Sequence, residues 1–452
     1  DYNFILRLME ENGIWFQFKE APVPGSALSG TPGQEKLIIV DTPSVFESIP
    51  NDPNIKFRTR ADMVHQKDET FIDSIHELQI TRKTIPQTVI VKNYNYREPS
   101  TDLFSSKEIQ EGDIGLYYKY GGMYKKVHEA DAYSAIIADR FKCRQRIVQG
   151  RSDCKQFRAG CKFTVEEHLR DELNQEYLIT AVKHIGKFNE NQDFTTSYEN
   201  YFELIPEDVI ELYHPECIAE KGCMPGVTSA KIETLSSDYA TIDEQGRYKV
   251  KMNFDRSNTD NFQASKYIRQ SQIYSGQQYG CHFPSHKNAE MIIGHINSDP
   301  NKPVGLGTVP NTDTMSPVKN TNKEQSVIKT AGDNIIIMDD KKKAKSMTMS
   351  TPYDESFSAG SNQNITVGGD RNISVKNNES ESVSDDLENT IDGNQTLTVT
   401  GDKEETISQS HNKSVSGNKD QSISSNKKIE VTASSEETVT GNHTINVGKD
   451  DI

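Results

Sequence analysis

The side chains that could do chemistry in this chain lack the spacings that catalytic and metal sites need. His282 and His286 lie four residues apart, which on a helix would put two metal ligands on one face. Pro284 between them argues against a helix there, so we interpret both as loop histidines. The motifs His-Glu-x-x-His and Gly-x-Ser-x-Gly, the Walker loop and the Rossmann fingerprint are absent from the sequence.

Clustered charges also have a simple interpretation. The acidic pairs Glu10-Glu11 and Asp385-Asp386 are typical of solvated faces rather than of paired acid–base catalysts. The run Lys341-Lys342-Lys343 could contact phosphate, but it fits a charged turn better. We therefore predict that the protein is not an enzyme, with no catalytic residue, no metal site and no cofactor.

The cysteines do not change this prediction. None of the six belongs to a Cys-x-x-Cys pair, so zinc binding and thioredoxin-type redox chemistry are not indicated. We expect reduced, mostly buried thiols, with a Cys217–Cys223 disulfide as the alternative. The six are Cys143, Cys154, Cys161, Cys217, Cys223 and Cys281.

A repeat near the C-terminal end dominates the sequence. Eleven β-branched residues recur there at a spacing of eight, with no position skipped, in a background of polar residues and glycine. They are Val367, Val375, Val383, Ile391, Val399, Ile407, Val415, Ile423, Val431, Val439 and Val447. A fixed period in such a background predicts a repeat architecture rather than a disordered tail.

Each octad reads as a short strand followed by a turn. Pairs such as Gly369-Asp370 and Gly417-Asn418 follow the key aliphatic residue, and such pairs tolerate the positive φ that sharp turns need. A second row lies two residues before each key residue, on the same side of the strand. It is aliphatic in places, as at Ile365, but polar at Glu405 and Lys413, which we expect to pair or to line a hydrated core.

A single chain cannot bury this aliphatic row. Full burial of a Val or Ile is worth about 1.5–3 kcal/mol, whereas ordering the backbone costs about 1–2 kcal/mol per residue. Single-chain solenoids usually have hexapeptide, nonapeptide or much longer periods, so a period of eight favours several identical chains wound together. Strands stacked at about 4.8 Å would make the octads a rod roughly 50 Å long.

The rest of the chain reads as mainly β with a few helices. Phe4, Ile5, Leu8 and Met9 mark one face of a first helix, which Asn12-Gly13 ends. A second helix is predicted over 130–146, and 22–33 is a Pro/Gly/Ser loop. Strands are predicted at 14–18, 37–40, 77–82, 88–94, 162–165, 176–184 and 335–338.

From Gly222 onward the sequence pattern changes to that of short strands separated by turns. Five strands in about ninety residues predict a small closed barrel such as an OB-fold. The predicted strands are 230–232, 239–242, 248–254, 267–270 and 291–296.

Charge and targeting signals limit the partners. The net charge of −16 would multiply in an oligomer and argues against nucleic acid as a partner. The sequence contains no secretory signal and no apolar run of membrane-spanning length, so we expect the protein to be made and assembled in the cytoplasm.

Four stretches of the chain, in this order, carry a family resemblance: 4–14 (FILRLMEENGI), 173–184 (LNQEYLITAVKH), 243–256 (DEQGRYKVKMNFDR) and 294–304 (GHINSDPNKPV). With the octads behind them, they make the chain similar to the VgrG family, the spike proteins of type VI secretion systems. More distantly, the chain resembles the hub and spike proteins of contractile phage tails. No single motif is decisive, but the ordered set is specific.

The resemblance implies a homotrimer built from a partial hub β-barrel domain, an OB-fold collar and a C-terminal triple-stranded β-helix needle. The expected regions are a hub-like domain at 1–215, the collar at 222–311, a connector and the start of the shaft at 312–360, and the needle at 361–452. Family hubs carry a substantial stretch before the residues that match 1–20, so the resemblance implies an N-terminally truncated hub. No effector domain is expected after Gly448, and the bridge from Asn311 to the shaft is too short for an enzyme.

The resemblance also implies partners and a mechanical role. A tube of Hcp-type subunits would meet the hub, and a PAAR-repeat tip protein with effectors or adaptors would sit on the C-terminal end. Ile445, Val447 and Gly448 are the expected docking residues for the tip, and three copies of His443 could meet a metal on the axis. The assembly would be secreted into a target cell after puncturing its envelope, with transient contact to the membrane.

Two other functions stay open on the sequence. A phage tail spike or a receptor-binding β-rod fibre could use the same repeat, although hub and barrel motifs before the rod favour the spike. A peptidoglycan hydrolase lacks both a domain and a catalytic constellation here.

Overall fold

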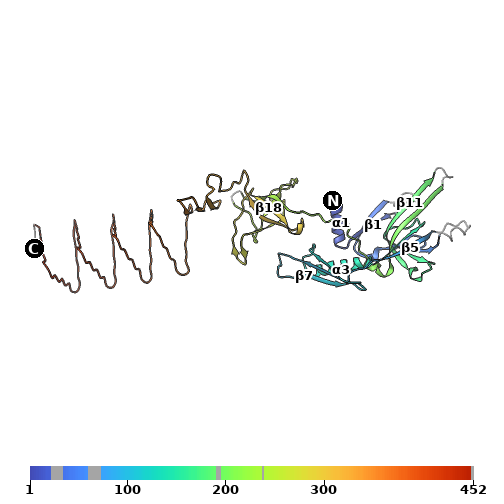
Figure 1. Cartoon of the computed structure of the whole chain (residues 1–452), viewed down its shortest axis with the longest axis horizontal. Coiled ribbons are helices and arrows are strands. Elements are labelled where there is room, and N and C mark those ends of the chain that lie inside the picture. Colours follow the sequence, from blue (N-terminus) through green and yellow to red (C-terminus); the bar gives the residue numbers. More distant parts are fainter. Residues whose placement is uncertain (22–33, 60–72, 190–194, 237–238, 449–452) are drawn as a thin grey trace. The chain divides into compact units, whose positions relative to one another are not determined.

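The computed structural model describes residues 1–21, 34–59, 73–189, 195–236 and 239–448. They divide into two compact units, 1–354 and 355–452. Figure 1 shows the strands and helices of the first unit and the repeated bends of the second. The predicted loop at 22–33 lies outside the described residues.

The first unit opens with a helix and a hairpin. Helix α1 (Tyr2–Glu11) ends where Gly13 adopts a φ of +71°, which confirms the predicted stop. Strands β1 (Trp15–Ala21) and β2 (Gln34–Val40) then pair in antiparallel fashion.

Helix α1 exposes Phe4 and Ile5 of its predicted apolar face, keeps Leu8 and Met9 partly buried, and buries polar residues as well. Phe4 and Ile5 are 58% and 55% exposed, whereas Arg7 and Glu10 are buried. The polar face is buried because it has tertiary partners: the Glu10 carboxylate accepts hydrogen bonds from the backbone N–H groups of Ile218 and Ala219, at 3.2 and 3.0 Å. Local hydrophobic periodicity cannot reveal such a partner.

A six-stranded barrel forms the core of the hub. Its strands run in the order β11-β12-β9-β5-β4-β10, and β10 pairs back onto β11 to close it. Phe157, Phe163, Tyr177 and Leu204 fill its interior. The strands are β4 (Asn54–Phe57), β5 (Ser74–Arg82), β9 (Arg146–Ser152), β10 (Cys161–Glu166), β11 (Glu176–Asn189) and β12 (Thr195–Pro206), with β3 (Glu47–Ser48) added beside β10.

A smaller layered module is inserted between β5 and β9. Its sheet has the order β7-β6-β8, formed by β6 (Thr88–Asn93), β7 (Leu103–Glu108) and β8 (Leu116–Tyr120). Helix α3 (Val127–Cys143) packs Ala130, Ile137 and Ala138 against Val89, Val91 and Leu103 on one face of this sheet. The helix predicted at 130–146 is thus confirmed, with its ends shifted by three residues.

The collar is a closed five-stranded barrel. Its sheet has the order β14-β13-β18-β19-β15, and a bridge between Tyr248 and Ile268 joins its two edges. Numbered within the collar, this is the order 1-2-3-5-4-1 of an OB-fold. The strands are β13 (Val227–Glu233), β14 (Lys249–Met252), β15 (Arg269–Gln270), β18 (Glu290–His295) and β19 (Pro303–Val309), with a small β16–β17 hairpin (Ser275–Gly276 and Tyr279–Gly280).

Two details of the collar differ from the sequence prediction. Residues 239–242 do not form a strand, because Asp243 organises a turn by accepting hydrogen bonds from the backbone N–H groups of Gln245 and Arg247, each at 3.0 Å. Strand β19 was not predicted, since Gly305 and Gly307 interrupt its apolar pattern.

Beyond the collar, an antiparallel sheet of β20 (Gln325–Lys329), β21 (Ile335–Asp339) and β22 (Ser346–Ser350) ends the first unit. Four short 3₁₀ turns complete the described helices: Pro43–Val45, Asp171–Leu173, Glu207–Leu212 and Ile296–Ser298.

The second unit consists of extended segments joined by bends at a regular spacing of eight residues (Figure 1). We call its described residues, 355–448, the shaft. From Val367 to Val439, a bend directly follows each key aliphatic residue, as at 368–369 after Val367 and 416–417 after Val415. The prediction that the turns need positive φ is wrong: among the described residues, none beyond Lys343 has one. Bends between extended segments can be made within the β and α regions, so left-handed glycine is not required.

Candidate functional site

The key row of the shaft consists of the eleven aliphatic residues from Val367 to Val447. From Val367 to Val439 their side chains are 43–50% exposed, whereas the aliphatic members of the second row, such as Ile365 and Leu397, are 59–73% exposed. One chain therefore begins to shelter the key row but leaves about half of each side chain in water. Complete burial needs further chains.

Among the polar members of the second row, Glu405 has a partner within the chain. Its Oε2 lies 3.1 Å from Nζ of Lys403, so within a single chain Glu405 pairs with Lys403 rather than with Lys413. The hydrogen bond from Lys403 lowers the pKa of Glu405, and the charge of Lys413 contributes in the same direction. Lys403 can reach Glu405 because residues two apart point to the same side of an extended segment.

A second constellation joins the hub to the collar, and we call it the hub–collar junction. Tyr96, just after β6, accepts a hydrogen bond of 3.1 Å from Nη1 of Arg247 in the collar. The guanidinium of Arg269 lies over the Tyr96 ring at 4.0 Å. Burial would raise the pKa of Tyr96, but hydrogen bonds from Arg97 and Arg247 outweigh it and lower the pKa. Arg247 is held in turn by Asp243, whose Oδ2 accepts from Nε at 2.7 Å.

A lysine–amide contact reinforces the junction. Nζ of Lys302 in the collar donates to Oδ1 of Asn93 at 2.9 Å. The buried Asn93 side chain is fixed from its other end, because Nδ2 donates to the carbonyl oxygens of Gly122 and Tyr124. On the linker between hub and collar, Lys221 pairs with Asp299 at 2.8 Å.

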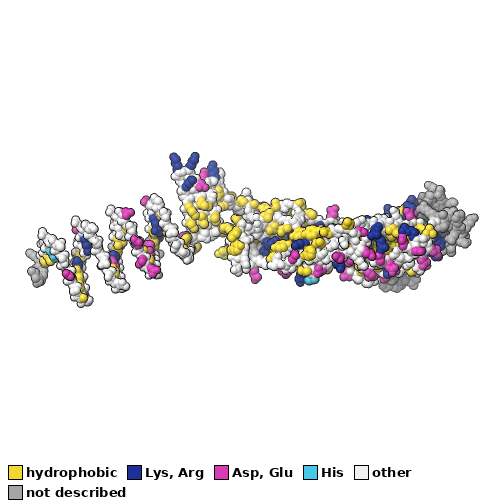
Figure 2. Space-filling model, turned by 60° about the horizontal axis from the view of Figure 1, so that its bottom comes forward, with side chains coloured by type: hydrophobic (Ala, Val, Ile, Leu, Met, Phe, Trp, Pro, Cys, Tyr) yellow, Lys and Arg dark blue, Asp and Glu magenta, His cyan; other side chains and the backbone are white. Residues whose placement is uncertain are grey.

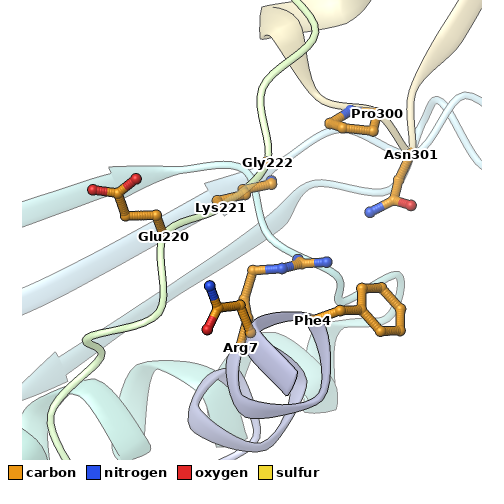
Figure 3. Close-up of a pocket in the computed structure, with 8 residues that line it drawn as sticks. Phe4, Arg7, Glu220, Lys221, Gly222, Pro300 and Asn301 are labelled. Atoms are coloured by element: carbon orange, nitrogen blue, oxygen red, sulfur yellow. The ribbon is translucent and has the colours of Figure 1, made fainter. Parts of the chain in front are cut away.

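A cavity of about 340 Å³ lies at the same junction (Figure 3). Figure 3 shows the Arg7 side chain extending from α1 into the space below Asn301, with Phe4 beside it and Lys221 on the linker. Its other lining residues are Asn3, Glu220, Gly222 and Pro300. Glu220 is the one carboxylate that lines the cavity, and no nucleophile lies beside it, which does not suit hydrolysis. We therefore assign the cavity to the packing of hub and collar.

The chemistry-bearing residues of the sequence stay apart in the structure. The ring of His282 contacts Tyr248 Oη at 3.3 Å and Gln272 Nε2 at 2.6 Å, and among the described residues no group of three or more His, Cys, Asp or Glu side chains could hold a metal ion. All six cysteines are unpaired thiols. Burial raises the pKa of Cys143 and of Cys154 to about 12, which makes both inert as nucleophiles.

The expected tip residues lie at the end of the described shaft. Ile445 and Val447 are 73% and 68% exposed in the single chain. Among the described helices, none combines the length and the apolar character that crossing a membrane requires.

The junction residues were not singled out from the sequence. Arg247 and Lys302 lie within stretches that carry the family resemblance, but Tyr96 follows a predicted strand with no local signal of its role. Its partner lies 151 residues further along the chain, and only the fold brings the two together.

Two family models match parts of the chain. Residues 1–191 match the phage tail baseplate hub (GPD), and residues 320–431 match the C-terminal trimerisation domain of bacteriophage T4 gp5. The second match covers β20–β22 and most of the shaft.

Curated relatives are type VI secretion spike proteins. The Pseudomonas aeruginosa spike protein VgrG1b is 22% identical over 86% of this chain and 50% of its own length. Spike protein VgrG1a of the same species is 23% identical over 81% of this chain and 57% of its own length. The actin cross-linking toxin VgrG1 of Vibrio cholerae is 27% identical, over 57% of this chain and 24% of its own length. The chain thus spans about half or less of the relatives it matches.

Among solved structures, an E. coli component of the type VI secretion system resembles the chain. It is described as structurally similar to the T4 tail proteins gp27 and gp5. The alignment has a TM-score of 0.42 and 19% identity, and covers 68% of this chain and 60% of that one.

Proposed function

Because the chain belongs to the VgrG family of type VI secretion spike proteins, related to the hub and spike proteins of phage tails, we propose that it is a non-catalytic spike subunit. Three copies form one spike, which a contractile machine drives through the envelope of a target cell. The work is mechanical, and the protein contributes rigidity and shape.

The key row is the observation that carries this proposal. From Val367 to Val439 its members stay about half exposed in one chain, and those from Val367 to Val431 lie in a region that matches a trimerisation domain. Three chains that share the row as a common axis would bury it. Strands bonded to neighbouring chains on both sides also present few open edges, which suits a rod under axial load.

The two ends of the spike would meet different partners. The hub faces a tube of Hcp-type subunits, and the far end carries a PAAR-repeat tip protein with effectors or their adaptors. Ile445, Val447 and Gly448, in the last described octad, are the residues proposed to dock that tip. The spike is assembled in the bacterial cytoplasm and leaves with the machine when the sheath contracts, touching the target membrane only in passing.

Mass and shape in solution test the assembly. We expect light scattering of the full chain to give three times the 50.9 kDa of one chain, with an elongated shape and an SDS-resistant band. A monomer with an unfolded shaft would refute the proposal. Pull-downs with Hcp-type and PAAR-type proteins then test the two ends separately.

A receptor-binding β-rod fibre is the alternative. The match of residues 1–191 to a baseplate hub favours the spike, because a fibre needs no hub. Saturable binding of the purified trimer to intact cells, without binding to a tube protein, would favour the fibre. Release of fragments from purified peptidoglycan would contradict the non-catalytic assignment.

A further inference from the structure

The sheet β7-β6-β8 is covered on one face only. Its inner face packs on α3, where Tyr117 contacts Phe141 at 5.1 Å and Lys119 donates to Tyr133 at 2.6 Å. Successive side chains of a strand point to opposite faces, so the alternate residues point away from the helix. We call these outward residues the open sheet face.

The register of the strands places aromatic and aliphatic residues beside one another on the open sheet face. Tyr120, Lys92 and Phe104 lie side by side across the three strands, and Tyr118, Ile90 and Ser106 form the next row. Leu116, Tyr118, Tyr120 and Phe104 are 63%, 53%, 50% and 43% exposed. Figure 2 shows hydrophobic side chains gathered over this sheet.

An exposed surface of this kind marks an interaction site. Contiguous apolar patches on soluble proteins are small unless a partner covers them, and tyrosine is enriched in protein interfaces. Strand β8 is also an edge strand among the described strands, pairing with β6 alone, and its outward residues include no proline or charge to block association.

We infer that the open sheet face docks on a neighbouring copy of this chain; this inference rests on the proposed threefold spike. The sheet belongs to the same compact unit as β20–β22, and those strands lie within the match to the trimerisation domain. Three copies of the unit are therefore tethered to one axis, at an effective concentration on the order of millimolar.

The charge distribution of the chain also favours a second copy as the partner of the open sheet face. Each copy carries a net charge of −16, so most of its surface repels another copy. On the open sheet face, Lys92 lies 3.2 Å from Asp102, and Glu108 is the one further charged residue of the three strands that points outward. A face with so few charges meets less like-charge repulsion from a second copy than a strongly acidic surface would.

Site-specific photo-crosslinking of the full chain tests the inference. Tyr118 or Tyr120 is replaced by p-benzoylphenylalanine, and the matched control places the same group at Leu169, which is 89% exposed on a hub turn. After irradiation of the purified trimer, we expect covalent dimers and trimers from the Tyr118 and Tyr120 derivatives. The Leu169 derivative is expected to stay monomeric on a denaturing gel.

The outcomes separate the inference from the proposed function. If the unirradiated protein is a monomer, the threefold spike fails and the inference falls with it. If the protein is a trimer but all three derivatives stay uncrosslinked, or if crosslinks form only to an added tube protein, the inference alone is overturned. As a second readout, Tyr118→Lys with Tyr120→Lys should leave the trimer mass unchanged while amide exchange in 103–120 becomes about tenfold faster; unchanged exchange would also overturn it.

Discussion

The phenol oxygen of Tyr96 in the hub accepts a 3.1 Å hydrogen bond from Arg247 in the collar, while the Arg269 guanidinium lies 4.0 Å from the centre of the same ring. One tyrosine thus takes two contacts from the collar, one through its oxygen and one through its ring. Lys302 of the collar also donates a hydrogen bond to Asn93, the last residue of β6. The collar therefore contacts this part of the hub at both Asn93 and Tyr96. Hub and collar are therefore joined by side-chain contacts in addition to the linker.

Replacing Tyr96 should loosen this joint in two steps. Tyr96→Phe removes a charge-assisted hydrogen bond worth about 1.5 kcal/mol, which corresponds to about tenfold faster opening. Tyr96→Ala also removes the cation–π contact, for a further loss of about 0.5–1 kcal/mol. Amide exchange of the linker 214–226 measures the opening. The control is Tyr94→Phe, because Tyr94 is 52% exposed two residues away; an effect as large as that of Tyr96→Phe would refute the assignment.

The key row should tolerate charge far less than its neighbours. Val399→Asp combined with Val415→Asp would place carboxylates on a dry axis, and each lost valine alone is worth about 1.5–3 kcal/mol per chain. We expect loss of the SDS-resistant trimer and a much lower melting temperature of the shaft. Thr398→Asp with Ser414→Asp changes the charge equally on the opposite side of the same segments. Equal heat resistance of the two double variants would mean that no buried axis exists.

Glu10 should matter more than its neighbour Glu11. Glu10 is 2% exposed and accepts two backbone N–H groups of the linker, so Glu10→Gln turns one acceptor into a donor that faces an N–H. We expect a loss of about 1–3 kcal/mol in the free energy of unfolding of the first unit, measured by urea titration. Glu11→Gln is the control, since the Glu11 carboxylate lies 3.6 Å from Arg7 and its Oε2 has no hydrogen-bond partner to lose. Equal losses would show that the linker contacts contribute nothing.

A structural feature could be predicted from the sequence where the residues that determine it lie close together along the chain. The shaft was predictable because its signal repeats every eight residues from Val367 to Val447, and the OB-fold because its strands are short and closely spaced. The burial of Glu10 in α1 was not predicted, because its carboxylate bonds to the backbone of Ile218 and Ala219, far along the chain. Tyr96 was missed for the same reason, since its partners come from a different domain.

Acidification should weaken the packing of α1 on the hub through His214. Nδ1 of this histidine lies 3.1 Å from the carbonyl oxygen of Gly13, directly after the helix. Burial lowers the pKa of His214 below its ordinary 6.5, against the opposing effects of that hydrogen bond and of Asp139. The unfolded chain therefore binds a proton at a higher pH than the folded one.

The sign of the effect follows from this difference. Between the lowered folded pKa and 6.5 the unfolded state holds more protons, so the free energy of unfolding falls as the pH falls through this window. His214→Asn should flatten this slope in urea titrations run from about pH 5 to 8, the range in which an ordinary histidine titrates. His128→Asn, at the exposed start of α3, is the matched control and should leave the slope unchanged. Asp139, whose pKa burial raises above 3.8, acts in the opposite direction at lower pH, because its protonated form is favoured in the folded state. A slope that survives His214→Asn would show that another group senses the pH.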